Sequence, residues 1–537
     1  MRKWLFMFVL AMFLVPQPIG FAQSLPPAEP DSEAFIEANF HLQDYYQSVR
    51  CVSAVGSCPS EVEVQVPCLT AQCEHPLMTY TIQDTYSTIQ SAADEAQAGD
   101  LIIIMPGHYG GVQLEEVGGD EGAYIHFLGW GDAGTVVVDQ SADPSKSWLR
   151  HWFYFIDAHH YIIQNLAFEG ADDGAGIFVS GYFSETGHFS HHFVVMDVYS
   201  HDNGEWGLHS TATSYLLVQD SIFTHSGEEH GAYISGSGDH VLIRRNVFQS
   251  NELSGLQVNA DPQTATMELF YWLQNSTGDT CGWSEEDADY GGSAGWQDIK
   301  ACYDEQGLPD LGEFIEDGIS EDLIIEQNVI TDNGSGGAAG INLASVRNSV
   351  VRNNLIYGNG AAGIACWDNA YAEEKGLASS VYGCHAVDIL NNTIVDEAGN
   401  RGALILNHDA RDMRVYNNII IRDRYDAYEV AVNSGSGLQS GYNYYFAQSI
   451  DESPGFRGDE QSLTGFSIPE ALTHFVNPSF DLWVIEDGDW PNLNSTRPDY
   501  RLVTDSVLRQ AGNAEVAPVL DLYGYPRAGA EIGAIAQ

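Results

Sequence analysis

Positive charge is scarce in this sequence of 537 residues. Lysine and arginine together number 21 against 75 aspartate and glutamate residues, so the formal net charge is −54. A field of this sign repels nucleic acid and anionic membrane surfaces, and neither is expected as a partner. A polyanionic substrate would need local cations or a bound metal ion, and the simplest use of the charge is solubility in a saline habitat.

A long apolar run is missing after the first twenty residues. The run from Trp4 to Val15 is too short to cross a bilayer. It follows Arg2 and Lys3 and precedes a small-residue segment at 20–22, which is the arrangement of a secretory signal peptide. We therefore expect a signal peptide at 1–22, no membrane span and a secreted or periplasmic chain, with a retained anchor as the competing interpretation.

The usual spacings of zinc ligands are also missing, since neither C-x2-C nor HExxH occurs. The eight cysteines fall into four close pairs, and an even number in an exported chain favours disulfides. Neighbour pairing is the simplest of many connectivities, although the sequence does not decide among them. The neighbouring pairs are Cys51 and Cys58, Cys68 and Cys73, Cys281 and Cys302, and Cys366 and Cys384.

A repeat runs through the middle of the chain. An Asn or Asp recurs three positions after an apolar residue, and its flanks alternate with the period of two of a β-strand. The polar positions are Asn165, Asp197, Asp220, Asn246, Asn328, Asn354, Asn392 and Asn418. We expect these side chains to stack and to hydrogen-bond along the repeat.

A second landmark follows most of these positions by nine to twelve residues, a glycine that begins an apolar-x-apolar triplet. It occurs at 176–179, 207–209, 231–234, 255–258, 340–343 and 363–366. Each coil then has three short strands, and stacking buries what one coil cannot. A leucine-rich repeat lacks support because its Leu-x-x-Leu-x-Leu consensus is absent, and a propeller would need four strands per blade of about 40 to 45 residues.

This pattern resembles the pectin-lyase-like superfamily of right-handed parallel β-helices. The segments 86–93 and 99–109 resemble that family's N-terminal capping helix and first strand, and the tail from 498 resembles the end of many secreted members. The resemblance implies an all-β fold of three-strand coils with a long loop insertion. We expect a cap region with cysteine pairs at 23–78, including a helix at 33–49, a β-helix at 79–440 with the insertion at 261–320, and C-terminal coils and cap at 441–537.

In that superfamily the substrate groove usually runs along the first sheet, which the resemblance maps onto the glycine-initiated strands. The outward positions would be Phe178, His209, Tyr233, Gln257, Asn342 and Ala365. A second outward row, two residues further on, would hold Ser180, Thr211, Ser235, Asn259, Ala344 and Trp367. Neighbouring strands lie about 4.8 Å apart, so each row would be contiguous. A solvated structural face is the competing interpretation.

The turns before these strands are rich in histidine and acidic residues. Eleven of the eighteen histidines lie between positions 151 and 240. Histidine suits proton transfer near neutral pH, whereas clustered carboxylates suit calcium. Calcium is therefore the candidate cofactor, held by Glu205, Glu228 or Glu229.

Two insertions follow the expected groove strands, where they could wall a cleft. The first lies between Asn246 and Asn328 and carries several aromatic residues, and the second follows Trp367 and contains Cys384. Aromatic faces in a cleft stack on sugar rings, which makes Trp272 and Trp367 candidate substrate-binding residues. Core packing within the insertion explains its aromatic residues equally well.

Several well-known catalytic sets of the superfamily are missing. None of the four lysines lies on an expected groove strand, so the lysine base of several β-helix lyases has no match. The three-aspartate constellation of polygalacturonase-type hydrolases and the Asp-Pro-His motif of alginate epimerases are absent as well. Arg244, Glu326 and Arg352 occupy equivalent positions on the second strand and resemble a surface charge ladder rather than catalysts.

The favoured hypothesis is a carbohydrate-active enzyme, a polysaccharide lyase that works by β-elimination. Such chemistry needs a base, an acid and a group that neutralises a carboxylate. His209 or His230 would be the base and Tyr233 the acid. Gln257, Asn259 or bound calcium would neutralise the carboxylate, with Asn342 as a further substrate contact.

Two alternatives remain from the sequence. A glycoside hydrolase would use paired acids such as Glu205 and Glu228. A non-catalytic glycan-binding or adhesin-like β-helix would account for the missing catalytic sets. In each case the expected partner is a polysaccharide and the chain is expected to be a monomer.

Overall fold

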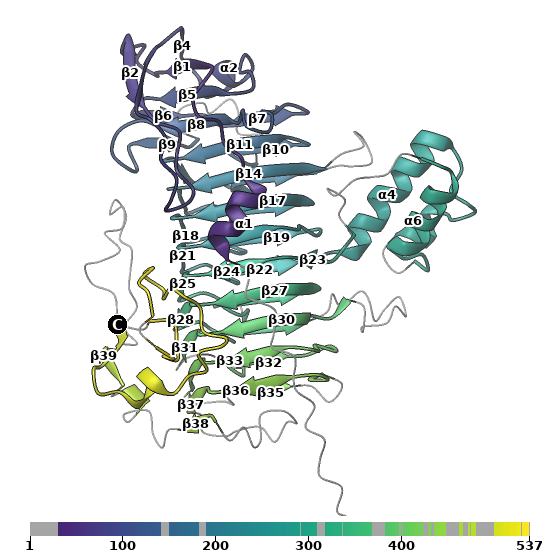
Figure 1. Ribbon diagram of the computed structural model, residues 1–537. Helices are drawn as coiled ribbons and strands as arrows, with labels where there is room; N and C mark the ends of the chain where they lie inside the picture. The colour runs from purple at the N-terminus through teal and green to yellow at the C-terminus, as the bar shows by residue number, and fades with distance from the viewer. Residues whose placement is uncertain are drawn as a thin grey trace, which may run out of the picture.

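The computed structural model describes residues 31–535 except for 141–149, 182–188, 290–291, 309–316, 336, 368–381, 397–398, 400, 423–427, 431–433, 447–460, 465–470, 473, 479–498 and 528. The expected signal peptide at 1–22 lies outside the described residues. Three long parallel sheets dominate the described part and stack their strands into one elongated body (Figure 1).

The 14-stranded sheet is the one that begins each coil. Its strands, in spatial order, are β4 (Asp84–Tyr86), β1 (Ser48–Val52), β5 (Asp100–Ile104), β8 (Ile125–Gly129), β11 (His159–Gln164), β14 (Ser190–Met196), β17 (Thr213–Gln219), β20 (Val241–Arg244), β24 (Ile324–Glu326), β27 (Val346–Arg352), β30 (His385–Leu390), β33 (Arg414–Tyr416) and β36 (Gln439–Gly441), with β23 (Ser320–Glu321) beside β27.

The 12-stranded sheet follows it in each coil. Its strands are β6 (Gly107–Tyr109), β9 (Val136–Val138), β12 (Ala167–Glu169), β15 (Tyr199–His201), β18 (Ile222–Thr224), β21 (Val247–Gln249), β25 (Val329–Thr331), β28 (Leu355–Tyr357), β31 (Thr393–Asp396), β34 (Ile419–Arg422), β37 (Tyr444–Phe446) and β38 (Leu463–Thr464).

The 10-stranded sheet completes the coil and holds the glycine-initiated strands. Its strands are β7 (Val112–Glu115), β10 (Phe153–Ile156), β13 (Ala175–Ser180), β16 (Trp206–Thr211), β19 (Ala232–Ser235), β22 (Leu256–Asn259), β26 (Ile341–Ala344), β29 (Ile364–Trp367), β32 (Leu404–Leu406) and β35 (Tyr428–Val430). A chain that visits three parallel sheets in turn, with right-handed crossovers, is a right-handed parallel β-helix, as the sequence predicted.

The core runs the length of this helix because every strand turns alternate residues inward. Its large fully buried side chains include Phe127, Phe153, Phe155, Phe168, Phe193 and Phe223. Each coil contacts mainly the coils before and after it, so the apolar surface is buried only by stacking. Burial contributes about 25 cal/mol for each Å² of apolar surface removed from water, and this term dominates the stability of the stack.

A ladder of asparagines lines one turn between the 14-stranded and 12-stranded sheets. From Asn328 onward, the side-chain oxygen of each residue accepts hydrogen bonds from the backbone and side-chain amides of the residue one coil earlier, as Asn328 Oδ1 does from both amides of Asn246 at 3.0 and 3.2 Å. Asn246 Oδ1 accepts from the backbone N–H of Ser221, which has no side-chain amide. The ladder consists of Ser221, Asn246, Asn328, Asn354, Asn392, Asn418 and Asn443. Buried polar groups require such partners.

The predicted ladder was wrong at its N-terminal end. Asn165, Asp197 and Asp220 lie one position before the ladder, because the strand register pairs Gln164 with Met196, then Gln219 and Arg244. They occupy instead the left-handed position of the turn, with φ between 53° and 56°. Asn and Asp tolerate that conformation better than other non-glycine residues, which is why they mimic a ladder in the sequence.

A second ladder, which the sequence analysis missed, crosses the turn after the 12-stranded sheet. Asn333 Oδ1 accepts from both amides of Asn251, and Asn359 Oδ1 accepts from both amides of Asn333. Each of these residues comes five positions after a member of the first ladder. That fixed offset was the signal available in the sequence.

The N-terminal cap differs from its prediction. The helix expected at 33–49 is shorter: α1 spans Ser32–Asn39, capped by the Asp31 carboxylate, and the chain then enters β1, which contains Val49. The capping helix α2 (Ile89–Ala93) forms within the predicted segment, and its Ile89 and Ala92 join the core. A hairpin of β2 (Glu61–Val64) and β3 (Met78–Thr81) completes this end, and β39 (Phe475–Asn477) pairs with β40 (Asp499–Leu502) near the other end.

The insertion is helical and has a small core of its own. It contains α4 (Pro262–Thr277), α5 (Glu285–Ala288) and α6 (Trp296–Glu305), which project from the side of the stack (Figure 1). Apolar side chains of α4 and α6 pack together and against Phe189 and Ala212 of the stack. Within the described residues, no helix is long and apolar enough to cross a membrane.

Three of the four expected cysteine pairs are disulfides. Cys51 joins Cys58, Cys68 joins Cys73, and Cys281 joins Cys302. The fourth expectation was wrong: Cys366 and Cys384 are free thiols, both buried in the core. Cys384 Sγ donates a hydrogen bond to the Leu343 carbonyl oxygen at 3.4 Å. Close spacing in the sequence therefore predicted the three disulfides that close loops. It wrongly predicted a disulfide between the two cysteines that are buried in the core.

Candidate functional site

The outward row of the 10-stranded sheet has the register that the sequence predicted. Each residue pairs with the next one along the stack, in the order Tyr154, Phe178, His209, Tyr233, Gln257, Asn342 and Ala365. The second row likewise runs Ser180, Thr211, Ser235, Asn259, Ala344 and Trp367. We call the first of these the catalytic-candidate row. Tyr154 extends it by one strand that the sequence analysis did not include.

His209 is a largely buried polar side chain of this row. It stacks on Tyr233 with ring centroids 4.8 Å apart, and Phe178 and Trp206 contact it at 4.5 and 4.3 Å. Its exposed fraction is 8%. Desolvation by this aromatic surround, aided by the nearby histidines His151 and His230, lowers the pKa of His209 well below its ordinary value, so the ring is neutral at neutral pH.

The two ring nitrogens of His209 have different surroundings. Nε2 lies 2.8 Å from Ser235 Oγ, while Nδ1 is buried with no hydrogen-bond partner among the described residues. The indole nitrogen of Trp206 is buried beside it in the same condition. Burying a polar group without a hydrogen-bond partner costs about 1–3 kcal/mol of folding free energy. Unpaired groups of this kind are often found where a protein binds a ligand. The sequence analysis missed Trp206, which is the first residue of β16 and precedes His209 on the same strand.

Tyr233 provides a hydroxyl next to this imidazole. Its oxygen accepts a hydrogen bond from Asn259 Nδ2 at 3.3 Å. Burial is the main cause that raises the pKa of Tyr233, so the phenol stays protonated and can donate. The predicted pair of His209 and Tyr233 is therefore together, in its base and acid forms respectively.

His230 is placed beside the row but is oriented away from base catalysis. Its Nδ1 accepts the backbone N–H of Ser254 at 3.0 Å, so in the neutral ring the proton is on Nε2, which lies 3.3 Å from Glu229 Oε2. Burial lowers the pKa of His230 to about 3. The ring contacts Tyr233 edge-on at 5.2 Å, which gives His230 a packing contact with the acid.

Amide side chains continue the row beyond Tyr233. Gln257 Oε1 accepts from Asn342 Nδ2 at 2.7 Å and from Ser254 Oγ at 3.4 Å, which fixes the direction of its amide. Trp367 donates its indole N–H to Asn342 Oδ1, and the guanidinium of Arg401 lies 5.3 Å from the Trp367 ring centroid. Trp367 is thus part of the predicted site, with a cation over its face.

Trp272 is not part of this row. It lies on α4 and packs, partly exposed, against the helical core of the insertion, as do Tyr271 and Trp283. Packing within the insertion therefore accounts for this tryptophan, one of the two interpretations that the sequence left open.

The three glutamates expected to hold calcium lie in the turns beside the row. Glu205 Oε1 is 3.3 Å from Arg150 Nη2, and its Oε2 is buried without a hydrogen-bond partner among the described residues. Desolvation raises the pKa of Glu205, the nearby Arg150 opposes this, and Asp173, Glu229 and Glu228 add to it. The unsatisfied carboxylate oxygen of Glu205, with other acidic residues nearby, is the kind of ligand that calcium prefers. Arg150, however, already neutralises part of the negative charge there.

The outward row of the 14-stranded sheet is covered instead of open. Gln219, Arg244, Glu326 and Arg352 are in register on adjacent strands, and α1 with residues 69–72 lies over them. The sequence analysis described this as a surface ladder, which was wrong because Arg244, Glu326 and Arg352 are only 2–6% exposed. We call it the covered arginine row.

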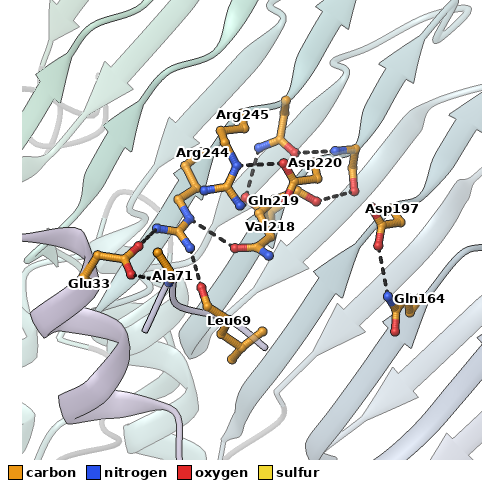
Figure 2. A network of polar contacts seen from close by, with 12 residues as sticks. Glu33, Leu69, Ala71, Gln164, Asp197, Val218, Gln219, Asp220, Arg244 and Arg245 are labelled. Carbon is orange, nitrogen blue, oxygen red and sulfur yellow. Dashed lines mark hydrogen bonds and ion pairs between the residues drawn. The ribbon is translucent and has the colours of Figure 1, made fainter. Parts of the chain in front are cut away.

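The polar contacts of Arg244 in the covered arginine row are made within the protein (Figure 2). Arg244 donates to Glu33 Oε1 at 2.9 Å, to the Leu69 carbonyl at 2.6 Å and to Gln219 Oε1 at 3.1 Å. Arg352 Nε donates to Glu326 Oε2 at 2.8 Å. A pocket of about 700 Å³ borders this row, between α1 and residues 515–524. These guanidinium groups bind structural partners, so the catalytic-candidate row has the stronger claim to chemistry.

Comparison with known proteins adds no family assignment. No protein-family model matches the chain, and no curated protein matches it. Among solved structures, a pectate lyase is similar at 16% identity over 84% of this chain and 91% of its own, with a TM-score of 0.45. The A-module of an Azotobacter vinelandii mannuronan C-5 epimerase is similar at 16% over 70% and 93%, with a TM-score of 0.39.

An alginate lyase from Paenibacillus sp. is similar at 13% identity over 65% of this chain and 95% of its own, with a TM-score of 0.37. Likeness at this level does not transfer an activity, because one fold hosts many functions. The chain is therefore identified by its architecture, a right-handed parallel β-helix.

Proposed function

We propose that this protein acts on a polysaccharide by β-elimination at the catalytic-candidate row. The observation that carries the proposal is the stacked pair of His209 and Tyr233, with ring centroids 4.8 Å apart, in which burial keeps the imidazole neutral and the phenol protonated. Paired titratable groups with opposite protonation tasks are the usual mark of acid–base catalysis.

In this mechanism the base removes the proton beside a uronate carboxylate. Ser235 Oγ lies 2.8 Å from His209 Nε2. The Ser235 hydroxyl therefore donates its proton to the imidazole and, at the same time, removes the proton from the substrate. The carbanion electron pair then forms the new C=C bond as the bond to the leaving oxygen breaks. Tyr233 supplies the proton to that oxygen, and the product leaves with an unsaturated end.

The carboxylate next to the carbanion needs hydrogen-bond donors or a cation, because negative charge builds up there in the transition state. Gln257 and Asn259 provide amide donors within the same two rows. Calcium held by Glu205, Glu228 or Glu229 is the proposed additional neutraliser. Its contribution would be to offset the repulsion between a polyanionic chain and a protein with a net charge of −54.

The test is incubation of the mature protein with acidic and neutral polysaccharides, with calcium or with a chelator. Ultraviolet absorbance reports unsaturated uronate ends, and a reducing-end assay reports hydrolysis. We expect absorbance to rise with at least one acidic polysaccharide. Reducing ends without absorbance would overturn β-elimination in favour of hydrolysis by paired carboxylates, and glycan binding with no turnover across the panel would favour a binding protein.

A further inference from the structure

Four histidines gather at the start of two neighbouring strands of the 14-stranded sheet, away from the catalytic-candidate row. His159 and His160 begin β11, and His191 and His192 lie near the start of β14. We call these four residues the imidazole cluster. The strands pair directly, with His159 opposite His191.

The backbone explains why consecutive side chains meet. In a regular strand they would point to opposite faces, but His160 and His192 adopt the left-handed conformation, with φ of 57° and 58°. This bend brings Nδ1 of His159 to 3.0 Å from Nδ1 of His160, and Nδ1 of His191 to 2.8 Å from Nδ1 of His192. A histidine in the left-handed conformation is uncommon, and here it occurs at equivalent positions of two adjacent coils.

Stacking of the coils then superimposes the two pairs. His159 lies parallel to His191 at 5.1 Å between ring centroids, and His160 lies parallel to His192 at 4.6 Å. Ring nitrogens of His160, His191 and His192 all lie within 4.8 Å of one another. The result is a concentration of imidazole nitrogens between two coils.

The space around the cluster is kept open on one side. Gly118 pairs with His159 from the preceding coil, and a side chain there would place its Cβ 2.6 Å from His159 Nδ1. His160 is 8% exposed, whereas the other three rings are half-buried, so solvent reaches the cluster. A Cβ at Gly118 would also lie 2.3 Å from the His159 carbonyl oxygen, so the glycine is needed for the close approach of the two coils at this point.

Burial favours the neutral form of the rings. Burial is the main cause that lowers the pKa of His160 to about 3 and that of His192 to about 4, with repulsion from neighbouring histidines adding to it. The carboxylates of Asp120 and Glu121 act on the pKa of His160 in the opposite direction, while the charges of His41 and of His240, which lies beyond Tyr215, lower the pKa of His192 further. Neutral imidazole is the form that binds metal ions.

These distances match part of the geometry of a metal site. With bonds of about 2.0–2.1 Å, two adjacent ligands at a right angle are about 2.8–3.0 Å apart, which is the spacing within each pair, and opposite ligands are about 4.1 Å apart. The nitrogens of His160, His191 and His192 lie within 4.8 Å of one another, so the stacked rings must rotate about their side-chain torsions to direct their nitrogens at one ion. We propose that the imidazole cluster binds one divalent transition-metal ion of the kind that prefers imidazole ligands, such as Cu²⁺, Ni²⁺ or Zn²⁺.

The experiment uses untagged mature protein stripped with a chelator, because a polyhistidine tag would bind the same ions. Equilibrium dialysis against Cu²⁺ measures stoichiometry and affinity, and electron paramagnetic resonance reports how many nitrogen atoms bind the copper. We expect one tight site per chain with coupling to at least three nitrogens. A spectrum of oxygen ligands alone, or no stoichiometric binding, would overturn the proposal without any variant.

Two substitutions then locate the site. His160→Gln and His191→Gln should each weaken Cu²⁺ binding by more than about tenfold, because each removes a ligand. His240→Gln is the matched control, since His240 lies further along the same histidine and tyrosine stack, 4.6 Å from the Tyr215 ring, and outside the cluster. Circular dichroism checks that each variant folds. Affinity unchanged in both cluster variants would place the copper elsewhere and refute the assignment.

Discussion

Two outward rows run along the same solenoid at the same spacing, and they are built in opposite ways. The covered arginine row carries full charges, and each charge has a partner and a cover. The catalytic-candidate row carries neutral side chains, stacks aromatic rings and leaves His209 Nδ1 unsatisfied within the described residues, as is Nε1 of the neighbouring Trp206 on the same strand. The difference teaches that full charges at equivalent strand positions can be structural, whereas a row of neutral side chains can leave a titratable group without a partner.

The largest expected effect separates the rows by activity. His209→Ala should lower kcat by about 10²–10⁴-fold, the usual contribution of a general base, with little change in KM. Steady-state rates of ultraviolet absorbance measure this. The control is His201→Gln on β15, which lies in a different sheet and should keep wild-type rates. Equal losses in the two variants would show that the loss at His209 is not specific to the catalytic-candidate row.

The second prediction concerns stability of the covered row. Arg352→Met should reduce the free energy of unfolding by about 3 kcal/mol or more, because it leaves Glu326 buried without its main partner, yet it should not alter kcat. Urea denaturation measures the change. Arg501→Met removes an exposed pair with Asp499, where we expect less than about 1 kcal/mol. If Arg352→Met lowers the free energy of unfolding no more than Arg501→Met does, the buried ion pair contributes no more to stability than the exposed one.

The third prediction concerns the pH dependence of the free energy of unfolding. It tests whether the buried histidines of the 14-stranded sheet and those beside the catalytic-candidate row are both neutral in the folded protein. Burial lowers the pKa of His126 on β8 and of His230 beside the catalytic-candidate row to about 3 each. Between about pH 6.5 and 3 the unfolded chain binds a proton that the folded chain does not, so stability falls as pH falls. Each group contributes a slope of up to about 1.4 kcal/mol per pH unit.

His126→Gln and His230→Gln test this point separately. Each should flatten the slope of unfolding free energy against pH over that window by up to one proton, measured by urea denaturation at several pH values. In the first variant, the amide of the introduced glutamine can still accept the hydrogen bond that the Tyr46 hydroxyl makes with His126 Nδ1, 2.7 Å away. A slope parallel to wild type would show that the substituted histidine is already protonated in the folded state.

The smallest expected effect lies at the edge of the catalytic-candidate row. Glu205→Gln should change unfolding free energy by less than about 1 kcal/mol, because its partner Arg150 is 56% exposed and solvent screens the pair. If calcium binds there, the same substitution should reduce the stimulation of activity by calcium. A calcium response equal to wild type would remove Glu205 from the proposed metal ligands.

Much of the fold could be predicted from the sequence because stacking repeats a short pattern. The register from Phe178 to Trp367 followed from glycine-initiated triplets, since a one-residue shift would expose the core. The ladder failed at Asp197 and Asp220 because Asn and Asp serve both the ladder and the left-handed turn beside it. The ladder position and the left-handed position are one residue apart, and a local sequence pattern does not show which of the two an Asn or Asp occupies.

The candidate site was harder to predict than the strands. Strand alternation placed His209 and Tyr233 side by side, but the hydrogen bond that fixes the tautomer of His230 comes from Ser254, on the next coil. The cover over Arg244 comes from Glu33 and Leu69, at sequence separations of 211 and 175 residues. Such long-range contacts leave no periodic signal, so the sequence could not show that Arg244 is covered.

The helical insertion has a consequence for how the molecule assembles. Adjacent coils are usually joined by contacts about 26 residues apart, but those across the insertion are 82 residues apart, as between Asn246 and Asn328. Closing the longer loop costs about 1 kcal/mol more in chain entropy, which slows nucleation across this junction. The stack is therefore expected to fold as two segments, one before and one after the insertion, which then join at the coil that carries Gln257.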